Sequence, residues 1–105
     1  MIEEGSLVIA YLCNPKERVW GVLIRLDTVG LVIRGLDLNS VEDWIAQERG
    51  DGPKLITPST QFVPMHRLER LYADEKAGAV EGYGDRYASL CGRDARKTLL
   101  DAADA

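Results

Sequence analysis

Apolar residues gather in two long runs between Val19 and Leu38, and this pattern predicts a pair of β-strands. The first run, Val19–Asp27, is largely apolar at both sets of alternating positions, as expected where a long strand bends and buries different faces along its length. Asp27–Gly30 predicts a tight turn, because Asp can bond the backbone two residues ahead and Gly tolerates a positive φ. The second run, Leu31–Leu38, predicts the returning strand.

Three shorter β-type runs flank this hairpin, at Ser6–Cys13, Thr60–Pro64 and Leu68–Ala73. Pro64–Arg67 leaves too little chain for a hairpin loop, so we expect a single 3₁₀-like turn between the last two strands. Five short, bent strands joined in this way predict a small β-barrel. The fold class is therefore mainly β with helical additions.

A helix is predicted at about residues 40–49, inserted between the third and fourth strands. Ser40 is a good N-cap residue, Val41, Trp44 and Ile45 share one side, and Gly50–Pro53 ends the pattern. If Trp44 is buried it is part of the core, and if it is exposed it indicates a partner surface.

The end of the chain predicts a linker and a helical tail. Asp74–Gly84 is polar and rich in glycine; Asp85 can cap a helix through Cys91, and Asp94 can cap a second helix to about Ala103. The apolar side of this tail must pack either on its own barrel or on a neighbouring subunit. The predicted organisation is a barrel at residues 1–75 and a helical extension at residues 76–105.

Composition narrows the class of protein. A chain of 105 residues with a net charge of −4 is one domain that is not built for bulk electrostatic capture of nucleic acid, although a local basic site is compatible with it. Arg34, Arg67 and Arg70 are candidates for such a site, or else belong to a solvated face. Cys13 and Cys91 form no CxxC pair, which is typical of reduced thiols in a cytoplasmic protein. Because the start is acidic and no apolar run approaches about 20 residues, we expect neither a secretion signal nor a membrane span.

The sequence contains no recognisable catalytic set. The one histidine, His66, excludes the usual Cys/His metal spacings, and the adjacent Glu42 and Asp43 point to different sides of their helix. No glycine-rich phosphate loop is present. We therefore expect a protein that is not an enzyme and has no cofactor and no metal.

Two stretches resemble the paired motifs of Sm-like proteins, a family that includes LSm and Hfq-like members. Val19-x-Gly21-x-Leu23-x-x-x-Asp27 is similar to the first motif, and Phe62–Leu71, with its His66-Arg67-Leu68 step, is similar to the second. The resemblance covers Ser6–Ala73, and it places Ser40–Pro58 in the family's variable loop.

This resemblance implies a homo-oligomeric ring in which the fourth strand of one subunit pairs with the fifth strand of the next. It implies RNA or single-stranded nucleic acid binding around the pore. The implied nucleic-acid residues are Asp27, Thr28, Val29, Gly30, Met65, His66 and Arg67. The implied subunit interface comprises Gln61, Phe62, Val63, Leu68, Arg70 and Tyr72.

Each of these roles has an alternative. Asp27 can simply close its turn, His66 can stabilise the 3₁₀ step, and the barrel can be a monomer whose edges the tail covers. Leu31 occupies the position at which much of the family carries an RNA-binding Asn, and Pro64-Met65 occupies that of an Arg-Gly pair. An alternative function is therefore a protein-interaction or assembly scaffold with its helices as partner surfaces.

Overall fold

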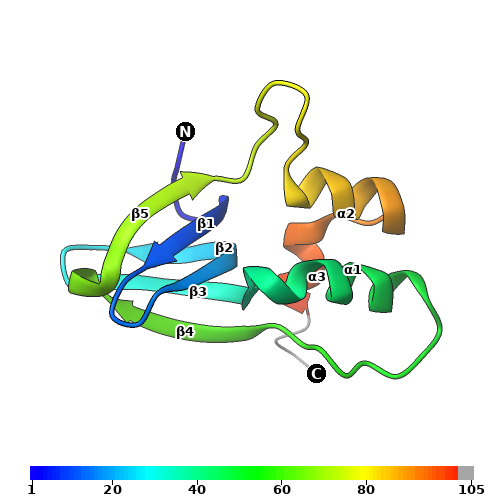
Figure 1. The fold of residues 1–105 in the computed structure, drawn as a ribbon, viewed down its shortest axis with the longest axis horizontal. Helices are drawn as coiled ribbons and strands as arrows, with labels where there is room; N and C mark the ends of the chain where they lie inside the picture. The colour runs from blue at the N-terminus through cyan, green and yellow to red at the C-terminus, as the bar shows by residue number, and fades with distance from the viewer. Residues whose placement is uncertain (102–105) are drawn as a thin grey trace.

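The computed structural model describes residues 1–101 as five strands, three α-helices and two 3₁₀ turns (Figure 1). In chain order these are β1 (Leu7–Leu12), β2 (Glu17–Leu26), β3 (Gly30–Asp37), η1 (Leu38–Ser40), α1 (Val41–Arg49), β4 (Ser59–Pro64), η2 (Met65–Arg67), β5 (Leu68–Ala73), α2 (Tyr83–Cys91) and α3 (Ala95–Asp101). The predicted β-rich class, the inserted helix and the 3₁₀ step between the last two strands are confirmed.

The five strands form one antiparallel sheet in the order β4-β3-β2-β1-β5. Although η2 joins β4 directly to β5, these two strands lie at opposite edges of the sheet. Within residues 1–101, β4 pairs with β3 alone and β5 with β1 alone. The sheet is therefore open along both edges, and the pairing does not show the closed barrel.

The curvature of the sheet comes from irregular register and from one glycine pair. Register shifts occur between Leu23 and Arg25 on β2 and between Tyr11 and Leu12 on β1. Gly21 lies directly opposite Gly35, and a Cβ on either residue would collide with the backbone of the other strand. Only glycine therefore permits the close approach of β2 and β3 at this point.

The two faces of the sheet bury separate apolar clusters. The inner core contains Val8, Ala10, Leu12, Val19, Leu23, Leu31, Ile33 and Val63. The other face carries the helix-side core, in which Trp20, Val22 and Leu36 pack against all three helices. Trp44 is 2% exposed and stacks on Tyr87 with ring centroids 4.8 Å apart, so it is a core residue.

The helical tail packs on its own sheet. Tyr87 of α2 and Leu99 of α3 are fully buried in the helix-side core. Figure 1 shows the three helices gathered at one end of the sheet, away from η2 and most of β5. The tail therefore covers part of one face and leaves the β4–η2–β5 side uncovered.

One expected helix start and one expected helix cap differ in the structure. Helix α2 begins at Tyr83 rather than Asp85, because the carboxylate of Asp74 accepts hydrogen bonds from the Tyr83 and Gly84 N–H groups, both at 2.8 Å. The Ser40 side chain makes no capping bond; Asp37 instead caps η1 by accepting from Asn39 N–H. Helix α3 is capped by Asp94 as predicted and runs to Asp101, and its expected end at Ala103 lies outside the described residues.

Candidate functional site

The structure brings together the two segments that were predicted to bind nucleic acid. The Met65 N–H donates to the Val29 carbonyl at 2.9 Å, so the β2–β3 turn lies beside η2. Thr28, Val29 and His66 are exposed on this surface, and Val29 is 68% exposed. We call Asp27–Gly30 together with Met65–Arg67 the loop surface.

Asp27 closes its own turn. Its carboxylate accepts from Val29 N–H at 2.9 Å, from Arg25 Nε at 3.1 Å and from Gly30 N–H at 3.3 Å. These bonds, chiefly the one from Val29 and then the one from Arg25, hold the pKa of Asp27 below its usual value. A carboxylate with these partners orders the backbone of the loop surface.

Arg67 is directed away from the β2–β3 turn and toward the β1–β2 turn. Its guanidinium donates to Cys13 O at 3.1 Å, Pro15 O at 2.8 Å and Glu17 Oε1 at 2.6 Å. The exposed polar side chains of the loop surface are therefore those of Asp27, Thr28 and His66, while Arg67 holds the β1–β2 turn against η2.

The three candidate arginines do not form one basic patch. Arg34 donates to the Leu99 carbonyl at 3.1 Å and to Thr60 at 3.3 Å, whereas Arg70 donates to the Tyr72 hydroxyl at 2.9 Å. Each of the three arginines serves a different local contact, so positive charge is not concentrated at the loop surface.

The predicted interface residues lie on the two edge strands. Gln61, Phe62, Arg70 and Tyr72 are exposed, Leu68 is half-buried, and Val63 is buried in the inner core. Phe62 packs its ring on the backbone of Gly30, where an added Cβ would lie 2.8 Å from Phe62 Cζ. Because Val63 is buried, its side chain cannot contribute to an interface.

The hydrogen-bond pattern shows which β4 backbone groups face outward. The Met65 N–H points inward to Val29, and bonding residues of an antiparallel pair alternate along the strand. Val63 and Gln61 therefore also bond to β3, while the N–H and C=O groups of Thr60 and Phe62 point away from the sheet. Pro64 takes an outward position, where its missing N–H breaks no bond of this ladder.

Strand β5 also has backbone groups that face outward. The Asp74 N–H bonds to Leu7 O at 2.9 Å, so Tyr72 and Arg70 bond to β1 and the alternate residues do not. The backbone groups of Leu71 and Ala73 therefore point outward. Both edges of the sheet present backbone donors and acceptors without a strand partner in the described part of the chain.

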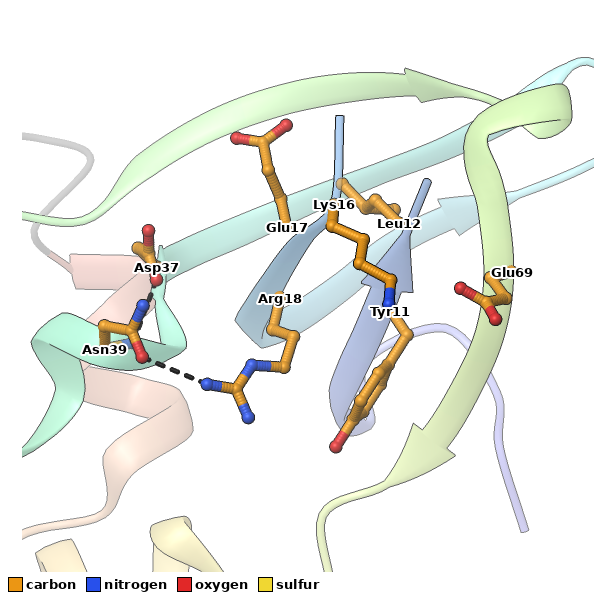
Figure 2. Close-up of a pocket in the computed structure, with 8 residues that line it drawn as sticks. All are labelled: Tyr11, Leu12, Lys16, Glu17, Arg18, Asp37, Asn39 and Glu69. Atoms are coloured by element: carbon orange, nitrogen blue, oxygen red, sulfur yellow. Dashed lines mark hydrogen bonds between the residues drawn. The ribbon is translucent and has the colours of Figure 1, made fainter. Parts of the chain in front are cut away.

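A pocket of about 430 Å³ lies where the β1–β2 turn, the end of β3 and β5 meet (Figure 2). We call it the Tyr11 pocket; it is lined by Tyr11, Leu12, Lys16, Glu17, Arg18, Asp37, Asn39 and Glu69. Arg18 Nη2 donates to Asn39 Oδ1 at 3.1 Å, and Asn39 N–H donates to Asp37 at 2.9 Å. The sequence does not predict this pocket, because only the strand register brings these residues together.

Within residues 1–101, no group of three or more His, Cys, Asp or Glu side chains is arranged to hold a metal ion. In the same part of the chain, no helix has the length and apolar character needed to cross a membrane.

Comparison of the chain with protein-family models, curated proteins and solved structures finds no match.

Proposed function

We propose that this protein is a non-enzymatic, Sm-like assembly module that forms a closed homo-oligomer by pairing β4 of one copy with β5 of the next. The observation that carries the proposal is the pair of open edges, with outward backbone groups at Thr60 and Phe62 on β4 and at Leu71 and Ala73 on β5. Pairing between copies would satisfy both edges and complete the barrel-like curvature.

The side chains at these edges support the same function. Phe62 is 53% exposed and Tyr72 is 42% exposed, so each edge carries an aromatic side chain that can be buried between copies. The helices cover the other end of the sheet and leave both strands accessible (Figure 1). The main apolar residues of the tail, Tyr87 and Leu99, are buried on its own sheet, so they offer no partner surface.

A proline at an outward-facing position of β4 tests directly whether this strand pairs with another copy of the chain. Thr60→Pro removes an N–H that makes no bond within the sheet, whereas Thr60→Ala removes the same hydroxyl, including its contact with Arg34, and keeps the N–H. We expect Thr60→Pro to lower the oligomeric mass measured by light scattering and Thr60→Ala to leave it unchanged. Equal masses for the two variants and the parent chain would contradict pairing through β4.

A second candidate function is binding of single-stranded nucleic acid at the loop surface. It is favoured by the Met65–Val29 hydrogen bond, which joins the two predicted segments into one surface beside η2. Filter binding with U-rich and A-rich RNA across a salt series tests it, with His66→Ala as the variant. Absence of binding at low salt, or full binding by His66→Ala, would remove this candidate.

A further inference from the structure

We propose that the Tyr11 pocket binds a nucleotide unit, with its phosphate against Lys16 and Arg18 and its base on the ring of Tyr11. The pocket belongs to a single copy of the chain and lies on the β1–β2 side, whereas the loop surface lies at the β2–β3 turn. Its volume of about 430 Å³ falls in the range of small-ligand sites, about 300–1,000 Å³.

The aromatic part of the site spans two strands. Tyr11 on β1 meets Tyr72 on β5 edge-to-face, with ring centroids 5.2 Å apart and an interplanar angle of 67°. Arg70 donates to the Tyr72 hydroxyl and lies 5.8 Å from its ring centroid, which holds the Tyr72 ring in place. The half-buried ring of Tyr11 is held by its contact with Tyr72, so it is a preorganised surface for stacking a planar base.

The cationic part of the site comes from the β1–β2 turn and the start of β2. Lys16 and Arg18 are exposed, and Figure 2 shows the Lys16 side chain extending toward Tyr11 and the Arg18 guanidinium turned toward Asn39. Arg18 uses one of its five N–H groups on Asn39, which orients the guanidinium and leaves donors for an anion. Together the two side chains provide donors for a phosphate group.

Two of the three pocket carboxylates are already engaged. Glu17 pairs with Arg67 at 2.6 Å, and Asp37 accepts from the Asn39 N–H. The charge of Glu17 is thus balanced by Arg67, whereas Asp37 receives a hydrogen bond from a neutral amide. Glu69 faces the pocket from β5 and, like the Asn39 amide, can bond ribose hydroxyls or the base edge.

The cations, the aromatic ring and the hydroxyl-bonding groups of the Tyr11 pocket together indicate the class of ligand. Cations alone would suit a free phosphate, and an aromatic ring alone would suit many apolar ligands. A phosphate site, a stacking ring and hydroxyl-bonding groups in one pocket match a nucleotide, either free or as one unit of a single strand.

The test compares free nucleotides with short strands. Binding of uridine and adenosine monophosphates is measured by calorimetry, and binding of oligo(U) and oligo(A) of about 12 nucleotides by fluorescence anisotropy, at about 50 mM salt. We expect Arg18→Gln to weaken binding about tenfold. The control Lys97→Gln, which removes another exposed positive charge from α3, should leave binding within about twofold.

Tyr11→Phe keeps the ring and should retain binding, whereas Tyr11→Leu should weaken it about tenfold. Binding of the monophosphates supports a free nucleotide as the ligand, and binding of the strands alone supports a nucleic acid. Failure of every probe to bind at about 1 mM overturns the proposal, as does undiminished binding by Arg18→Gln. Loss of binding in His66→Ala with retention in Arg18→Gln would instead assign binding to the loop surface and overturn the assignment to this pocket.

Discussion

At the scale of single residues, Asp74 joins the sheet to the helical layer. It follows β5, and its carboxylate accepts from the Tyr83 and Gly84 N–H groups at the start of α2 and from the Trp20 indole N–H at 3.0 Å. One side chain therefore caps a helix and also satisfies the polar atom of the buried Trp20.

Asp74→Ala should lower the free energy of unfolding by about 2 kcal/mol, because it removes the cap of α2 and leaves the buried Trp20 indole without its acceptor. Glu75→Ala, a carboxylate removal at the next, exposed position, is the control and should cost less than about 0.5 kcal/mol. Urea denaturation followed by tryptophan fluorescence measures both. Equal losses in the two variants would show that Asp74 has no such role.

The depressed pKa of Asp27 predicts a pH dependence with a definite sign. Because the folded state favours the ionised carboxylate, the stabilisation is present above the ordinary Asp pKa of about 4 and is lost as the pH falls through the lower folded-state value. Amide exchange at Val29 and Gly30 should therefore accelerate, relative to unfolded reference peptides, only below about pH 4. NMR titration of the Asp27 carboxyl gives the folded-state pKa directly, and a value at or above 4 would contradict the hydrogen bonds described here.

At the scale of elements, the β2–β3 hairpin depends on its glycine pair. A Cβ on Gly35 would collide with the carbonyl oxygen of Trp20, which belongs to the backbone and cannot move aside as a side chain can. Gly35→Ala should therefore destabilise the protein by about 3 kcal/mol. Gly52→Ala is the matched control, because no atom lies within 4 Å of its added Cβ, and its melting temperature should stay near that of the parent chain.

The elements were predictable where local pattern decides them. The β-type runs, the tight turn at Asp27–Gly30 and the 3₁₀ step at η2 each depend on neighbours in sequence, so their predicted bounds lie within a few residues of the structure. The predicted start of α2 at Asp85 was wrong, because the cap of this helix is Asp74, nine residues before Tyr83. A cap at that separation has no signature in the sequence.

Of the two candidate sites, one could be predicted from local sequence and the other could not. The loop surface could be predicted because its tight turn and its 3₁₀ step are both visible in the local sequence. Both also belong to the two motifs that resemble Sm-like proteins. The Tyr11 pocket could not, because Tyr11, Arg18 and Asn39 come from three segments that only the sheet register and η1 bring together. The partners of Arg34 and Arg67 were hidden for the same reason.

At the scale of the whole molecule, the helices and the two edge strands occupy different parts of the sheet. The helices bury Trp20, Trp44 and Tyr87 over one end of the sheet, while β4 and β5 keep outward backbone groups. Stability should therefore respond to changes in the helical layer, and assembly should respond to changes at the edges.

Leu99→Ala tests this separation. Removing a fully buried side chain from the helix-side core should lower the free energy of unfolding by about 3 kcal/mol. The oligomeric mass at temperatures where the variant is folded should not change. A loss of assembly in proportion to the loss of stability would show that the two functions are coupled.

The mass of the native protein tests the proposed assembly most directly. Native mass spectrometry of the full chain should give one defined multiple of 11.6 kDa, and Ala73→Pro, which removes an outward N–H of β5, should shift it toward 11.6 kDa while Ala73→Ser does not. A parent chain that remains at 11.6 kDa at about 100 µM would contradict assembly through the edge strands.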